Sequence, residues 1–244
     1  MWFLLQSSQA PVKVWLMFRY FAAMIKQLIF LLNHEIRLEF RQKHALAGIA
    51  LFSLSTIYVC YQAFRTLEDT TTWNALLWII LLFTAFNAIG KSFSNETRGH
   101  RLYLYWVVKP QLFVLAKIIY NALLMCVLAL MAFAVYVLFM GGIPVGTHGV
   151  FAYLLGLLLG SIGFACLLTL ISGIASRTDT GVGLTAVLGL PIAIPLILIL
   201  MRYSALVLRG VALSENLENL LFLVLLNTGM ATLTFLLFPY LWRD

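Results

Sequence analysis

Residues that could carry out chemistry are sparse in this sequence. It has no GxxxxGK[ST] phosphate-binding loop, no HExxH or GxSxG motif and no closely placed pair of catalytic carboxylates. Cys60, Cys126 and Cys166 lie in apolar runs without a CxxC or CxxCH motif, which is typical of small buried hydrophobes. No Asp or Glu lies near the middle of a long apolar stretch, where a proton-coupled carrier usually holds one. The sequence therefore predicts neither an enzyme, a metal site nor a secondary transporter, and no cofactor is assigned to the chain.

The segment 91–112 holds the most informative group of polar side chains. Its charged part is followed by an apolar run, 102–108, whose two tyrosines and one tryptophan suit the membrane interface. A proline then disfavours helix at the residue before it. A short element anchored in this way could receive a push from a soluble partner. The alternative is an ordinary basic loop, and the residues favour neither interpretation. The candidate coupling residues are Glu96, Arg98, Gly99, Arg101 and Pro110.

A few polar residues interrupt the apolar stretches. Lys117 and Asn121 lie one helical turn apart. We expect Lys117 to extend its ammonium to the lipid headgroups, with a functional pairing as the alternative. Asn87 and Asn227 are expected to form hydrogen bonds across helices. His148 is expected to be solvated rather than to bind haem or a metal.

Two further motifs concern helix packing and helix shape. Gly156 and Gly160 form a GxxxG motif, which allows another helix to approach closely. Packing within one chain is the expected use, and a dimer face is the alternative. Pro191 and Pro195 each remove a backbone donor, so they predict a kink or a partial unwinding. Such a break serves either access changes in a transporter or static packing.

The composition shows what kind of element must position these residues. The 244 residues are 63% hydrophobic and 10% charged, with a mean hydropathy of +0.99. A soluble domain is about 45–50% apolar and about 25% charged, so this chain cannot hide its apolar side chains in a water-soluble fold. The composition also excludes a disordered chain, a disulfide scaffold and a porin-type barrel. It predicts a polytopic helical membrane protein.

Six stretches are long enough to cross a hydrocarbon layer of about 30 Å, which takes roughly 20 helical residues. No repeat or second domain is apparent between them. The predicted fold is therefore all-α, with one membrane domain and an N-terminal arm. The expected spans are 45–64, 73–90, 113–140, 150–175, 182–201 and 220–241.

The basic residues predict the orientation of these spans. If the N-terminal arm is cytoplasmic, only Arg65, Arg202 and Arg209 of the sixteen basic residues fall outside. Cytoplasmic loops collect Lys and Arg, so we expect both termini to be cytoplasmic. The net charge of +7 then reflects orientation and contact with lipid headgroups rather than binding of nucleic acid.

The N-terminal arm has two parts. From residue 24 to 44, Ile25, Ile29, Leu32 and Ile36 recur at helical spacing, with basic residues largely elsewhere. This pattern favours an amphipathic helix in the plane of the headgroups, and the alternative is an extension of the first span. Residues 1–23 show no feature that we can assign, and we expect them to be a dispensable extension of the domain 24–244.

Two stretches of the chain resemble the haem exporter protein B (CcmB) family. Residues 155–200 carry a small-residue span, a polar turn and a span with the pattern LPxxxP. Residues 86–121 hold Phe93, Glu96, Gly99, the apolar run, Pro110 and the tripeptide 115–117 in the family's order. The arm 31–46 is similar to the family's start, and the likeness covers about residues 24–241.

The resemblance implies an ABC-2-type permease subunit used in cytochrome c maturation. It implies a multi-pass protein of the bacterial inner membrane, present as a homodimer, with ATP bound on a separate CcmA-like ATPase. CcmC-like, CcmD-like and CcmE-like proteins are further implied partners, and haem is the possible substrate. Whether haem itself is exported, or the haem-loaded chaperone is released, stays open. The alternatives are a general ABC-2 permease for a lipid, polysaccharide or drug, and a non-transporting scaffold of a haem-lyase complex.

Overall fold

Seven helices make up the described part of the chain in the computed structural model. The structure describes residues 10–41, 43–64, 69–90, 92–93, 110–141, 147–176 and 181–243, and no strand occurs among them. The helices are α1 (Ala10–Arg41), α2 (Lys43–Phe64), α3 (Thr70–Ile89), α5 (Pro110–Met140), α6 (Thr147–Ala175), α7 (Gly181–Leu208) and α8 (Leu217–Arg243).

Local chemistry fixes several helix ends. The Asp69 carboxylate accepts hydrogen bonds from the backbone N–H groups of Thr71 and Thr72, both at 3.0 Å, and so caps the start of α3. The Thr72 hydroxyl also donates to this carboxylate, at 2.6 Å, and this bond together with the two backbone bonds holds the pKa of Asp69 below its usual range. Pro110 is the first residue of α5, where its missing N–H costs nothing. The proline expected to end the 91–112 segment therefore also begins the next helix.

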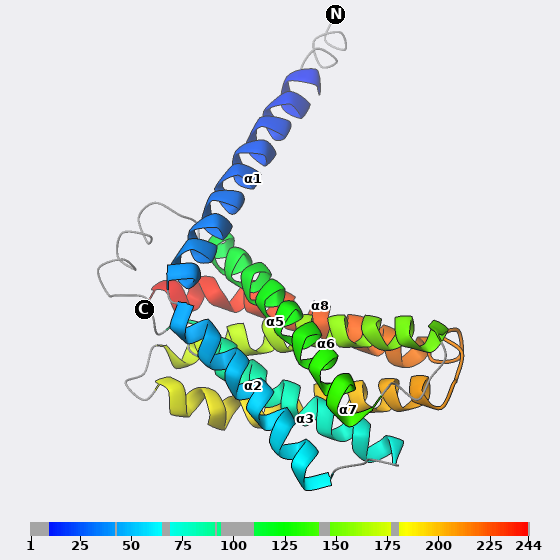
Figure 1. The fold of residues 1–244 in the computed structure, drawn as a ribbon. Helices are drawn as coiled ribbons and strands as arrows, with labels where there is room; N and C mark the ends of the chain where they lie inside the picture. Colours follow the sequence, from blue (N-terminus) through cyan, green and yellow to red (C-terminus); the bar gives the residue numbers. More distant parts are fainter. Residues whose placement is uncertain are drawn as a thin grey trace, which may run out of the picture.

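The bundle is built around α6, which contacts α3, α5, α7 and α8. Of its most apolar 18-residue window, 72% is buried, against 11% for α2 and 17% for α8. Helix α1 packs mainly on α5 and extends away from the bundle (Figure 1). Its direction differs from that of α2, so the arm is a helix of its own and does not continue the first span.

The described residues contain six helices long and apolar enough to cross a membrane, as the sequence predicts. Most of the expected limits differ by at most three residues from the observed ones. The exception is the fifth span, which was expected to end at residue 201, whereas α7 continues through Arg202 to Leu208. A single charged residue near the end of an apolar helix does not stop it, because a long side chain can lead its charge to the membrane surface.

The arm also differs from its expected limits. The amphipathic segment was expected at 24–44, but α1 begins at Ala10 and runs without a break past Met24. Residues 10–23 therefore belong to the same helix as the arm. The apolar stripe of the arm was expected to meet the lipid headgroups, and it is other side chains of α1 that pack against the bundle. Ile25 and Ile29 are exposed, whereas Leu31 and Glu35 are buried.

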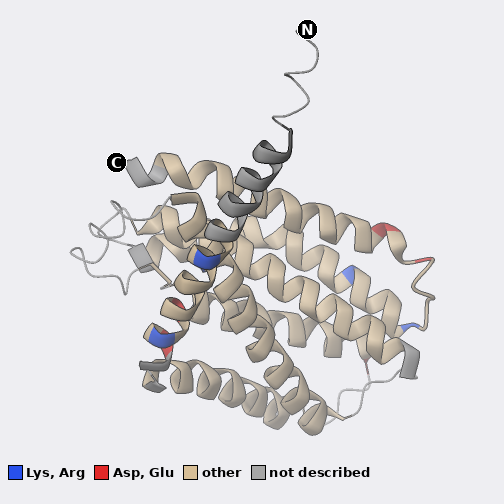
Figure 2. Cartoon of the chain, turned by 90° about the horizontal axis from the view of Figure 1, so that it is seen from above, with Lys and Arg blue, Asp and Glu red and all other residues tan. Residues whose placement is uncertain are grey.

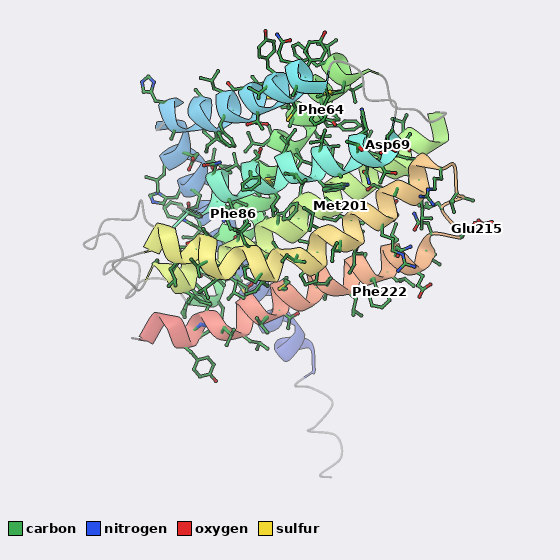
Figure 3. All side chains as sticks on the ribbon, turned by 90° about the horizontal axis from the view of Figure 1, so that it is seen from below. Phe64, Asp69, Phe86, Met201, Glu215 and Phe222 are labelled. Atoms are coloured by element: carbon green, nitrogen blue, oxygen red, sulfur yellow. The ribbon has the colours of Figure 1, made fainter. Side chains whose placement is uncertain are left out.

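Among the described residues, Lys, Arg, Asp and Glu lie mainly along α1 and toward the helix ends, and few lie elsewhere in the bundle (Figure 2). The bundle has an arm end and a far end. The arm end is where α1 meets α5, and the far end holds the starts of α3, α6 and α8 and the ends of α5 and α7. In Figure 3, Asp69, Met201, Glu215 and Phe222 lie toward the far end, and Phe86 lies toward the arm end.

Neutral hydrogen bonds join the helices at the far end. The Asn74 amide donates to the backbone carbonyl of Met201 at 3.0 Å, and its own oxygen accepts from the Tyr153 hydroxyl at 2.9 Å. The Tyr136 hydroxyl donates to the Trp73 carbonyl at 2.8 Å. These bonds tie α3 to α5, α6 and α7 and satisfy buried polar groups that lipid cannot serve.

The two glycines of the GxxxG motif in α6 lie directly against aromatic rings of neighbouring helices. A Cβ on Gly156 would come within 2.5 Å of the Tyr203 ring, and one on Gly160 within 2.7 Å of Trp78. The GxxxG motif thus serves packing within this chain.

Helix α7 is helical throughout Gly181–Leu208, so the partial unwinding that Pro191 and Pro195 predict is not observed. Both prolines lie on an exposed face of α7.

Candidate functional site

A buried ion pair joins the arm to the bundle. Lys117 of α5 donates to both oxygens of Glu35 of α1, at 3.1 and 3.0 Å. Lys117 is 3% exposed and Glu35 is 8% exposed. Each charge has therefore left water and depends on the other. It is the one ion pair observed among the residues that the structure describes.

Aromatic rings enclose the ammonium of Lys117. It lies 5.2 Å from the ring centre of Phe93 and 5.8 Å from that of Phe113, within the range of a cation–π contact. Phe238 of α8 packs against both rings, with centroids 5.6 and 6.1 Å away. Phe93 directly precedes the undescribed part of the 91–112 segment. Through Phe93, the ion pair thus contacts the start of that segment as well as α1 and α5. We call this start, Ser92 and Phe93, the root of the segment.

A second polar contact fixes the same root. The Asn121 amide donates to the Ser92 hydroxyl at 3.1 Å and to the Thr169 hydroxyl at 2.8 Å. Asn121 is one turn beyond Lys117 on α5, and Thr169 belongs to α6. Residues 92 and 93 are therefore bound side by side to the central helices of the bundle.

A second carboxyl lies beside the pair. Glu39, one turn after Glu35, accepts a hydrogen bond from the Tyr120 hydroxyl. Burial raises the pKa of Glu39 above its usual range, and the nearby charge of Lys117 and the bond from Tyr120 oppose this shift only in part. The inward face of α1 thus carries two carboxyls against the one ammonium of Lys117.

The structure corrects two expectations about polar residues in the spans. Lys117 does not extend to the headgroups, because a carboxylate from α1 meets it inside the protein. Asn87 does not bond across helices. Its amide donates to the Phe83 carbonyl of its own helix at 3.0 Å. The expectation for Asn227 is confirmed, since its amide donates to the Leu159 carbonyl of α6 at 2.9 Å.

Sequence reasoning missed Glu35 as a functional residue. A signal for it was present, because Leu28, Leu31 and Glu35 follow one another at helical spacing and Lys117 needed a partner. Glu96, Arg98, Gly99 and Arg101 lie outside the described residues, so the structure does not place them. The side chain of His148 is also outside the described part.

Within the described residues, no group of three or more His, Cys, Asp or Glu side chains could hold a metal ion. What the site can do is mechanical. It holds one helix end, one segment root and two central helices together through charges and hydrogen bonds that water does not reach.

Comparisons with known proteins give one match. A comparison with individual curated proteins finds no significant similarity. The family model described as CcmB protein matches residues 26–241, nearly the whole chain. The match begins inside α1 and ends near the end of α8, so it includes the ion pair and all six candidate spans. The chain belongs to the CcmB family, and it is thus a membrane permease component of a haem-exporting ABC transporter in cytochrome c maturation.

Proposed function

We propose that the arm end receives the motion of a separate CcmA-like ATPase and passes it into the membrane helices. The result of this coupling is haem export or release of a haem-loaded chaperone. The observation that carries the proposal is the buried Glu35–Lys117 pair beside Phe93, which joins α1, α5 and the root of the 91–112 segment.

The ion pair makes α1 and α5 move as one body. Pulling the two helices apart would leave a carboxylate and an ammonium unpaired in a poorly solvated site, at a cost of about 3–5 kcal/mol. A force applied to α1 is therefore passed to α5 before the pair yields. Helix α5 spans the bundle, so the force is carried toward the far end.

The root of the 91–112 segment offers a parallel route. Ser92 and Phe93 are held by Asn121 and by the ring packing, and Asn121 is bonded in turn to Thr169 of α6. A push on the segment reaches the most buried helix of the bundle through this chain. Glu96 would pair with a basic residue of the ATPase, and Gly99 would allow close approach.

The proposal places the arm end in the cytoplasm, with both termini there and the protein in the bacterial inner membrane. The distribution of basic residues supports this orientation. Reporter fusions at Glu68, Gly146 and Ser214 should then be active outside, and fusions at Gly99 and Asp179 inside. A reversed pattern would overturn the orientation and the docking site with it.

Membership in the family supports the remaining partners. We propose CcmC-like, CcmD-like and CcmE-like proteins, and a second copy of this chain, as members of the complex. Haem is proposed as the cargo of the system. Purification in mild detergent tests this set, because a scaffold without transport function would need no ATPase subunit.

Charge reversal at Glu96 tests the coupling proposal. We expect Glu96→Lys to weaken copurification of the ATPase or to uncouple ATP hydrolysis, while insertion in the membrane stays normal. Glu215→Lys is the matched control, since Glu215 is an exposed carboxylate at the far end. Normal ATPase binding and normal cytochrome c maturation in Glu96→Lys would show that the segment is a basic connector.

A further inference from the structure

A groove between α7 and α8 at the far end combines opposite charges with an apolar floor. Its volume is about 260 Å³. Figure 3 shows Phe222 of α8 beside this end of α7. The lining residues are Leu198, Ile199, Arg202, Glu218, Asn219 and Phe222.

Two charges in the groove have no partner from the described part of the chain. Arg202 and Glu218 line the same groove, yet no ion pair or hydrogen bond joins them to each other or to another described residue. Both side chains are exposed. The nearby Asn219 amide donates to Asn216 at 2.8 Å, so its oxygen remains as a further acceptor beside Glu218.

The level of Arg202 is that of a membrane surface. It lies six residues before the end of α7, about 9 Å along the helix axis. The neighbouring residue Met201 accepts the hydrogen bond from Asn74, within the far-end layer of Trp, Tyr and Asn side chains. From this depth the long stem of an arginine can bring its guanidinium to the headgroups.

The charged residues of the groove lie nearer the far end than its apolar residues do. Arg202 and Glu218 line the groove at its outer level, and Leu198 and Phe222 line it one helical turn deeper. Leu198 is 59% exposed and Phe222 is 53% exposed. Leu225, three residues deeper on α8, is 71% exposed. This order, a charged level above an open apolar track, matches a headgroup above its acyl chains.

We propose that this groove binds a phospholipid with a primary ammonium headgroup, phosphatidylethanolamine. The phosphate would accept hydrogen bonds from the Arg202 guanidinium. The ammonium would donate to Glu218 and Asn219, and an acyl chain would lie along Leu198, Phe222 and Leu225. A zwitterion satisfies both charges of the groove at once. An anionic lipid would leave Glu218 unpaired, and a choline headgroup has no N–H to donate.

A second groove on α8 shows what the charges add. It has a similar volume, about 230 Å³, and is lined by Gln111, Phe235, Leu236, Pro239 and Tyr240 near the arm end. None of these side chains is charged at neutral pH. Lipid can fill such a groove without selection by headgroup, so selectivity is expected only where Arg202 and Glu218 lie.

Native mass spectrometry of the full chain tests the proposal. The purified protein is delipidated and then titrated with phosphatidylethanolamine, phosphatidylcholine or phosphatidylglycerol of one acyl composition. We expect one phosphatidylethanolamine to be retained about tenfold more strongly than the other two lipids. Arg202→Gln should remove this retention. Glu218→Gln should keep binding of the phosphate but abolish the preference over phosphatidylglycerol.

Arg209→Gln and Glu215→Gln are the matched controls. Both residues are exposed charges of the far end that do not line the groove, so these variants should behave as the wild type. Equal retention of the three lipids by the wild type would overturn the proposal. Equal loss of retention in Arg209→Gln and Arg202→Gln would overturn it too, because the selection would then be a general effect of charge. Neither result depends on which end meets the ATPase.

Discussion

The two ends of the bundle are held together by different chemistry. The far end uses neutral hydrogen bonds between Asn, Tyr, Trp and Ser side chains and backbone carbonyls. The arm end also has neutral hydrogen bonds, from Asn121, but adds a buried ion pair and a cluster of phenylalanines that the far end lacks among the described residues. Neutral bonds to backbone groups persist whatever the neighbouring charges do, whereas a buried ion pair fails as a unit when either partner is lost. The far end is therefore suited to be a fixed support, and the arm end is suited to respond to a partner.

Loss of one partner of the ion pair should have the largest effect. Lys117→Met leaves Glu35 buried without its ammonium, so we expect a loss of stability of about 3–5 kcal/mol. Thermal unfolding of the purified protein in detergent measures this loss. Lys26→Met is the control, because Lys26 is an exposed lysine of α1. Equal unfolding temperatures for the two variants would mean that the pair contributes nothing.

Replacing both partners should recover most of that loss. In Glu35→Leu/Lys117→Met no charge remains buried, and apolar groups of similar size are often tolerated at such sites. We expect this double variant to be close to the wild type in stability while the ATPase drives it less well. A double variant that is stable and fully coupled would show that the pair only supports the fold.

The next effect concerns the packing toward the far end. Gly160→Ala places a methyl group within 2.7 Å of the Trp78 ring, and forcing it in should cost about 1–3 kcal/mol. Gly229→Ala on α8 is the matched change, since nothing lies within 4 Å of its new Cβ. It should be neutral or stabilising by about 0.5–1 kcal/mol, because alanine favours helix over glycine. Equal unfolding midpoints for Gly160→Ala and Gly229→Ala would contradict the close approach of Gly160 to the Trp78 ring.

A comparison of two tryptophans at the far end measures what one neutral hydrogen bond contributes to stability. Trp78 Nε1 donates to the Ser204 hydroxyl at 2.8 Å, whereas the buried Trp73 Nε1 has no partner. Trp78→Phe should therefore cost about 0.5–1.5 kcal/mol more than Trp73→Phe in the same unfolding measurement. The reverse order would mean that the bond adds no stability.

The smallest effect is a pH dependence of the arm end. Burial raises the pKa of Glu39, so its contribution to stability is full at pH below the unfolded value and declines as pH rises through the raised pKa. The groups that face it are Lys117, Tyr120 and Glu35. Glu39→Gln should remove this decline. We expect a difference below about 2–4 °C, the shift that 1 kcal/mol gives in a chain of this size, because solvent screens a half-exposed carboxylate.

Melting temperatures of the wild type and Glu39→Gln between pH 4 and 7 measure that difference. It should widen as pH rises. Glu215→Gln, at the far end, serves as the control. A constant difference across this range would mean that burial does not raise the pKa of Glu39.

The sequence predicts the spans because a run of about 20 apolar residues leaves a helix no alternative in hydrocarbon. It does not predict the partner of Lys117, because Glu35 is 82 residues away and only the folded chain brings them together. Lys117 was expected at the lipid headgroups because this distant partner is not apparent in the sequence. The fifth span was expected to end before Arg202 because a charge usually ends an apolar run, but here Arg202 lies within α7 and lines a groove at the far end.

The central claim, that the arm end is where the ATPase acts, is tested most directly by photo-crosslinking in the intact complex. A photoreactive residue is placed at position 99, in the 91–112 segment, or at position 214, in the far-end turn. We predict a crosslink to the ATPase from position 99 and none from position 214, with the yield at position 99 changing on addition of ATP. A crosslink from position 214, or none from position 99 in a complex that still contains the ATPase, would contradict the account.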